Sequence, residues 1–140
     1  WALAVLSGPA LLGLPYLPAP VALPGAFLAP GLMLAAMIGR RAARRGTDAA
    51  APEAVRGAGL DRQVVSDTVE QLVLALAVWP FVALTLGGAA AIALGLSFAL
   101  MRLLFWAGCH RSPLLRSLGF AGTFCPTVLA GFWALIRWAI

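Results

Sequence analysis

Four apolar blocks, each close to the length of a membrane-spanning helix, constrain the fold of this chain more than any other feature. They cover residues 21–39, 61–86, 88–109 and 117–138. A helix needs about 20 apolar residues to cross a bilayer. Only 11% of the 140 residues are charged, against roughly a quarter in a soluble domain. The sequence therefore predicts an all-α membrane protein, a four-helix transmembrane bundle that forms one domain over residues 1–140.

A further apolar segment precedes these blocks at residues 1–20, and both it and the next block contain prolines. Because proline removes a helical hydrogen bond and kinks a helix, residues 1–39 are compatible with two spans or with one irregular hairpin. We favour an additional N-terminal hydrophobic helix that packs outside the bundle.

The positive charge of the chain is concentrated in alternate links between the blocks. All ten basic residues are arginine, and six of them lie in residues 40–62. Two more, Arg111 and Arg116, flank the link after the block at 88–109, whereas the links at 18–20 and 86–89 carry no charge. Basic links tend to stay in the cytoplasm. We therefore expect a multi-pass membrane protein, with membrane lipids rather than nucleic acid as partners and a cytoplasmic basic loop at 40–60.

The two cysteines suggest neither a metal site nor a disulfide. Cys109 and Cys125 lie in or near apolar segments, without a CxxC spacing or a histidine pair. Metal sites and disulfide frameworks normally show such spacings.

Polar residues at the start of the second core block need an explanation. Gln63, Asp67 and Glu70 fall at i, i+4 and i+7, on one face of a helix. The charge-free remainder, 72–86, would span only roughly 22 Å as a helix, which is shorter than a hydrocarbon core about 30 Å thick. The helix should therefore begin earlier and carry the two carboxylates to the membrane boundary. An alternative is that Asp67 and Glu70 form a capping box at a helix N-terminus.

A carboxylate at membrane depth is costly unless it is paired. We therefore expect Glu70 to be buried and bonded to Arg102 or to an arginine of a neighbouring subunit.

A second set of polar residues lies in the segment MRLLFWAGCHRSPLLR, residues 101–116. Arg102, Phe105 and Cys109 share one helix face, and Arg116 follows a short turn. Arginines on one helix and carboxylates on another, at the same side of the membrane, are what a site for an anionic ligand needs. The alternative is that Arg102 snorkels to the interface and that Arg116 only anchors the helix there.

Two segments carry a resemblance to a known family. SDTVEQLVLAL at 66–76 and RLLFWAGCHRSPLLRSLGF at 102–120, together with ARR at 43–45, are similar to motifs of the MAPEG family, the membrane-associated proteins in eicosanoid and glutathione metabolism. The likeness extends over about residues 32–138 and suggests a bacterial-type member, which implies a place in a bacterial inner membrane. It implies a homotrimer of four-helix bundles that binds glutathione between subunits, near the cytoplasmic face.

The resemblance also implies roles for individual residues. Arg116 matches the arginine that stabilises the glutathione thiolate and is the expected catalytic residue. The expected glutathione-binding residues are Arg40, Arg41, Arg62, Gln63, Asp67, Glu70, Arg102, Phe105 and Cys109.

Three of these positions depart from the family pattern. Asp67 replaces an asparagine, and Phe105 and Cys109 replace two tyrosines, which removes two hydroxyl donors. Two functions are therefore expected as alternatives. One is a glutathione transferase or peroxidase that acts on lipophilic substrates. The other is a non-catalytic protein of the same fold, a lipid-binding or accessory subunit of a larger membrane complex.

Overall fold

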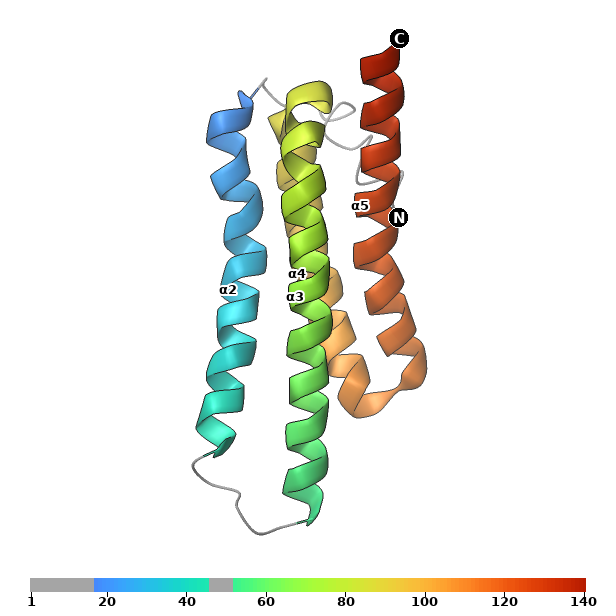
Figure 1. The fold of residues 1–140 in the computed structure, drawn as a ribbon. Coiled ribbons are helices and arrows are strands. Elements are labelled where there is room, and N and C mark those ends of the chain that lie inside the picture. Colours follow the sequence, from blue (N-terminus) through green and yellow to red (C-terminus); the bar gives the residue numbers. More distant parts are fainter. Residues whose placement is uncertain (1–16, 46–51) are drawn as a thin grey trace.

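The computed structural model describes residues 17–45 and 52–140, which form four long helices joined in an up-and-down order (Figure 1). The helices are α2 (Ala19–Arg45), α3 (Pro52–Leu86), α4 (Gly88–Arg111) and α5 (Pro113–Ala139). Each contains a stretch long and apolar enough to cross a membrane. The predicted four-helix transmembrane bundle is confirmed. The additional helix expected at 1–20 falls almost entirely outside the described residues.

The helices extend further than the apolar blocks that predicted them. Most of the region expected as a loop at 40–60 is helical, because α2 continues to Arg45 and α3 already begins at Pro52. Alanine and arginine, which dominate the end of α2, favour helix strongly, and proline suits the first turn of a helix. Two prolines inside α2, Pro24 and Pro30, do not interrupt it, so residues 19–45 form one continuous helix.

The bundle has an inner pair of helices. α3 and α4 contact each other, and each also contacts α2 and α5, whereas α2 and α5 do not touch within the described residues. In Figure 1, α3 lies in front of α4, between α2 and α5. The outward faces of α3 and α4 therefore point to opposite sides of the bundle.

Trp79 joins all four helices at the centre of the core. Its fully buried ring stacks on Phe27 of α2, with ring centroids 5.0 Å apart, and meets the ring of Phe98 of α4 edge-on at 5.8 Å. Its indole Nε1–H donates to the hydroxyl of Thr127 on α5 at 3.4 Å. Buried tryptophans need such a partner for the N–H group, and here the partner fixes the position of the fourth helix.

Glycines allow α4 to approach its neighbours closely. A Cβ atom at Gly95 would clash with the backbone of Ala26 on α2, and one at Gly119 of α5 would clash with the backbone of Phe105 on α4. Small residues at helix contacts are the usual means of tight packing in membranes. Gly87 is the single residue between α3 and α4, and its φ of 96° lies in the left-handed region that glycine tolerates best.

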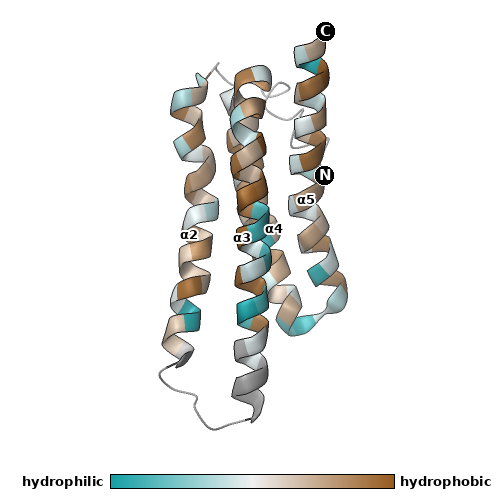
Figure 2. Ribbon diagram, viewed as in Figure 1, coloured by the Kyte–Doolittle hydropathy of each residue, from teal (hydrophilic) through white to brown (hydrophobic). Residues whose placement is uncertain are grey.

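The polar residues gather at one end of the bundle. Figure 2 shows hydrophilic positions where α2 ends, along the coloured part of the first half of α3 and where α4 turns into α5, with mostly hydrophobic helix surface beyond them. This polar end is where the sequence placed its candidate site residues.

Candidate functional site

The polar residues of α3 divide between two faces of the helix. Asp61 and Gln71 are buried against the other helices, whereas Arg62, Gln63 and Glu70 are exposed on the outward face. All of them lie inside α3, which begins at residue 52. The capping-box interpretation is therefore wrong, and the length argument, which required the helix to begin earlier, is confirmed.

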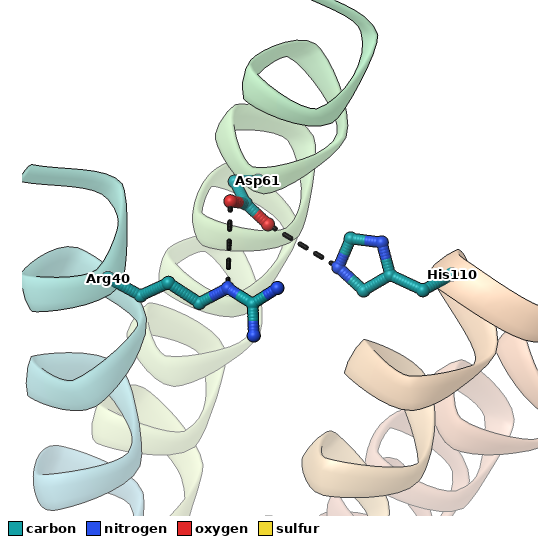
Figure 3. A network of polar contacts seen from close by, with 3 residues as sticks. All are labelled: Arg40, Asp61 and His110. Atoms are coloured by element: carbon teal, nitrogen blue, oxygen red, sulfur yellow. Dashed lines mark ion pairs between the residues drawn. The ribbon is translucent and has the colours of Figure 1, made fainter. Parts of the chain in front are cut away.

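Asp61 lies at the centre of a polar network that connects three helices (Figure 3). Its carboxylate is 3.9 Å from Nε of Arg40 on α2 and 3.5 Å from Nε2 of His110 on α4. The Asp61 side chain is only 5% exposed, whereas that of Arg40 is 40% exposed. The guanidinium of Arg40 also lies over the ring of Trp106, 5.0 Å from its centroid. Arg40 is thus held by a carboxylate on one side and an aromatic ring on the other.

Arg102 is a fully buried cation. Its Nη2 donates to the backbone oxygen of Asp67 at 3.0 Å. The guanidinium lies 4.8 Å from the ring centroid of Phe105 and 5.6 Å from that of Phe98. Within the described residues, Nε and Nη1 have no hydrogen-bond partner. Arg102 does not snorkel to the interface, because the two rings and α3 enclose it.

A second buried polar contact lies one turn further along α3. The hydroxyl of Thr123 on α5 donates to Oε1 of Gln71, and it also lies 2.9 Å from the carbonyl oxygen of Phe120. Among the described residues, Nε2 of Gln71 has no partner. Buried polar atoms are normally satisfied, so the layer of Arg102 and Gln71 differs from the rest of the core.

Phe105 and Cys109 belong to an apolar cluster rather than to a surface. Phe105 is buried together with Met33 and Met37 of α2 and with Val64 and Val65 of α3. Cys109 packs against the edge of the same cluster and is a free thiol.

The exposed face of α3 forms a polar stripe, which we define as Arg62, Gln63, Ser66 and Glu70. The hydroxyl of Ser66 lies 3.4 Å from Oε1 of Glu70. Glu70 makes no ion pair with a described arginine. The prediction that Glu70 is buried against Arg102 is therefore wrong for the single chain, because Arg102 contacts the backbone of α3 from the opposite side. Pairing with an arginine of a neighbouring subunit stays a prediction.

The remaining predicted site residues lie at the same end of the bundle, where Arg116 is near enough to Cys109 to interact with it electrostatically. Arg116, in the first turn of α5, is half-buried, and its backbone passes close to Gly108 of α4. Arg41, near the end of α2, is also half-buried. The structure thus brings Arg102 together with Asp67 and Phe105, and joins Arg40 to a different partner, Asp61.

Asp61 and His110 are the residues that sequence reasoning missed. Asp61 lies two residues before Gln63, and His110 is the only histidine of the chain. Asp61 lies seven positions before Thr68, which is also buried, so a search for helical spacing on the inner face would have found it. Within the described part of the chain, no group of three or more His, Cys, Asp or Glu residues is placed to hold a metal ion.

A bundle of four membrane-length helices with a buried polar layer at one end defines a multi-pass integral membrane protein. The model of the MAPEG family matches residues 21–136, and the chain belongs to this family. Neither the comparison with curated proteins nor that with solved structures gave a match.

Proposed function

We propose that the protein is a membrane-bound glutathione transferase that works as a homotrimer, with the polar stripe of α3 forming the glutathione site against a neighbouring copy. The observation that carries this proposal is the exposure of Glu70 within the candidate span Gly59–Leu86. An ionisable residue in a membrane segment normally faces a bundle interior or a polar cavity. A second copy that covers the stripe would give Glu70 such a surrounding.

The residues of the polar end suit glutathione chemically. Glutathione carries two carboxylates, an ammonium group and a thiol. Glu70 can hold the ammonium group, while Arg62 and Gln63 can hold a carboxylate, since arginine pairs with carboxylates in a bidentate manner.

Arg102 also has donor atoms, Nε and Nη1, that make no hydrogen bond within the described residues. Its enclosure by two rings makes Arg102 a positioning residue, which fixes the backbone of α3 at Asp67, one turn before Glu70.

Arg116 is the proposed catalytic residue. Glutathione supplies a thiol that loses its proton to become a thiolate. The thiolate attacks the electrophilic carbon of an aryl halide and forms a C–S bond, and the halide leaves with the electron pair of the broken carbon–halogen bond. A guanidinium next to a thiol favours the thiolate and lowers the thiol pKa. Arg116 is half-buried at the start of α5 and belongs to the same end of the bundle as the stripe.

An apolar groove offers a route for the lipophilic substrate. It lies between α3 and α5, has a volume of about 430 Å³, and is lined by residues such as Leu74, Phe81 and Phe132. Leu74 is one helical turn beyond Glu70. A substrate dissolved in the bilayer can therefore approach the stripe without crossing water.

The proposal is tested by assaying conjugation of glutathione to a hydrophobic aryl halide. The wild-type protein should catalyse the reaction and should show the ultraviolet absorbance of a bound thiolate. Arg116→Ala should lose both the activity and the thiolate signal while it still binds glutathione. Arg137→Ala, at the other end of α5, is the matched control and should retain both. Equal losses in the two variants would contradict the proposed role of Arg116.

A non-catalytic role in binding lipid or as an accessory subunit is the second candidate. Its support is the packing of Phe105 and Cys109 into an apolar cluster, where the family tyrosines would have offered hydroxyl groups. A wild-type protein that is trimeric and folded but inactive would favour this candidate.

We further propose that the polar end faces the cytoplasm of a bacterial inner membrane, because the basic residues at the ends of α2 and α4 favour that side. Arg111→Cys, in a background without Cys109 and Cys125, should resist an impermeant thiol reagent added to intact cells. Modification of this cysteine by the reagent from outside would contradict the proposed orientation.

A further inference from the structure

A groove on the outward face of α4 is separate from the polar stripe. It has a volume of about 570 Å³ and is lined by Arg40 of α2 and by residues of α4 between Leu100 and Arg111. Because the outward faces of α3 and α4 point to opposite sides of the bundle, this groove does not overlap the polar stripe of α3.

The groove changes from apolar to basic along α4. Leu100, Leu103 and Leu104 line its inner part, and all three are exposed. His110 and Arg111 line its outer part, at the end of the helix. From Leu100 to Arg111 the helix rises about 16 Å, enough for the upper part of an acyl chain and a head group. The gradient follows the direction in which a membrane changes from hydrocarbon to head groups.

Arg40 is fixed at the basic end of this groove rather than free in solvent. Asp61 holds its Nε, and the ring of Trp106, which also lines the groove, lies under its guanidinium. An arginine positioned in this way loses little conformational freedom when it binds a phosphate. Tryptophan is favoured at the depth of the head groups.

The net charge of the groove favours an anion. Arg40 and Arg111 contribute two positive charges, and no described carboxylate lines the groove. Asp61, which contacts Arg40, is almost completely buried. His110, which also contacts Asp61, is a further donor.

We propose that this groove binds one anionic phospholipid, with its phosphate between Arg40 and Arg111 and an acyl chain along Leu100, Leu103 and Leu104. The proposal does not depend on glutathione binding, since it uses the opposite side of the bundle from the stripe. It concerns the lipid that surrounds the protein, not a lipophilic substrate.

Native mass spectrometry of the detergent-solubilised full chain tests the proposal. The probe is an equimolar mixture of phosphatidylglycerol and phosphatidylcholine with identical acyl chains. The wild type should retain phosphatidylglycerol preferentially. Arg111→Gln should lower that preference about fivefold, the effect of one arginine near the membrane surface. Arg62→Gln, the same change on the outward face of α3, should leave the preference unchanged.

A second variant tests the acyl-chain part of the groove. Leu103→Gln should reduce retention of both lipids, because it places a polar group on the acyl path. Three outcomes would overturn the proposal: equal retention of the two lipids by the wild type, an equal loss in Arg62→Gln and Arg111→Gln, or displacement of the lipid by equimolar soluble glycerol phosphate. A fall in oligomer mass with Arg111→Gln would also overturn it, since the groove would then be covered by a second copy.

Discussion

The two halves of the bundle are built on different principles. In the half around Trp79, aromatic rings, small residues and one hydrogen bond to Thr127 fill the space between the helices. In the half around Arg102, buried polar atoms of Arg102 and Gln71 lack partners within the described residues, and the polar stripe of α3 faces outward. In the first half, the indole N–H of Trp79 has a hydrogen-bond partner inside the bundle. The second half carries polar groups that suit a ligand or another subunit.

This difference separates stability from function along one set of helices. Burying an aromatic ring stabilises a bundle directly, whereas a buried cation with few partners adds little stability and is often neutral when replaced. The half around Trp79 should therefore account for most of the folding energy. Under the proposed function, the half around Arg102 provides the groups that bind glutathione.

The largest expected effect follows from removing the central ring. Trp79→Ala should destabilise the protein by about 3–5 kcal/mol, because it deletes contacts with α2 and α4 and leaves a cavity. Unfolding in mixed micelles, followed by circular dichroism, measures the change. Leu84→Ala on the same helix removes a side chain that is 74% exposed and should change stability little. Similar losses for both variants would show that the core is not centred on Trp79.

Asp61→Asn, at the polar end, should lower the stability of the protein by less than Trp79→Ala does. The change removes the charge that holds Arg40 and His110, and it should cost about 1–2 kcal/mol, since Arg40 is partly exposed and its attraction is screened. Glu70→Gln is the matched control, because Glu70 is exposed on the same helix and makes no ion pair with a described arginine. If the control cost as much as Asp61→Asn, the network in Figure 3 would not be what stabilises this end.

The hydrogen bond between Trp79 and Thr127 should contribute less to the free energy of unfolding than the network of Asp61 does. Thr127→Val keeps the shape of the side chain and removes the acceptor, so we expect a loss of about 1 kcal/mol in the same unfolding measurement. In the background of Trp79→Phe, which lacks the indole N–H, the valine should cost almost nothing. An undiminished cost in that background would assign the effect to packing.

The smallest change in stability is expected at Arg102. Arg102→Met replaces the buried cation by an apolar side chain of similar length and should alter stability by less than about 1 kcal/mol, because the charge has little compensation to lose. The same variant should weaken glutathione binding, since α3 is no longer fixed at Asp67. A variant that lost several kcal/mol of stability and still bound glutathione normally would reverse the comparison between the two halves.

Much of the fold could be predicted from the sequence, because block length and hydropathy determine which segments span a bilayer. The length argument at residues 61–86 also placed Asp67 and Glu70 inside a helix. The direction in which each polar residue faces could not be predicted in the same way. Gln63, Asp67 and Glu70 share one face by spacing, yet Arg102 reaches the backbone oxygen of Asp67 from within the bundle, while Glu70 is exposed.

The network of Asp61 and His110 was missed for a related reason. It depends on which faces of α2, α3 and α4 meet, and single-helix periodicity does not specify the pairing of faces. The position of Phe105 could be predicted only in part, because its spacing from Arg102 gave the shared face but not the cluster of Met33, Met37 and Val64 that buries it.

The most direct test of the central proposal is calorimetric titration of glutathione into the purified protein, in a detergent that preserves the oligomer. The proposal predicts saturable binding below millimolar concentration, weakened about tenfold or more in Glu70→Gln, which loses a charge-assisted hydrogen bond. Arg111→Gln, on the opposite side of the bundle, should bind like the wild type. Absence of binding at millimolar glutathione, or equal weakening in both variants, would contradict a glutathione site at the polar stripe of α3.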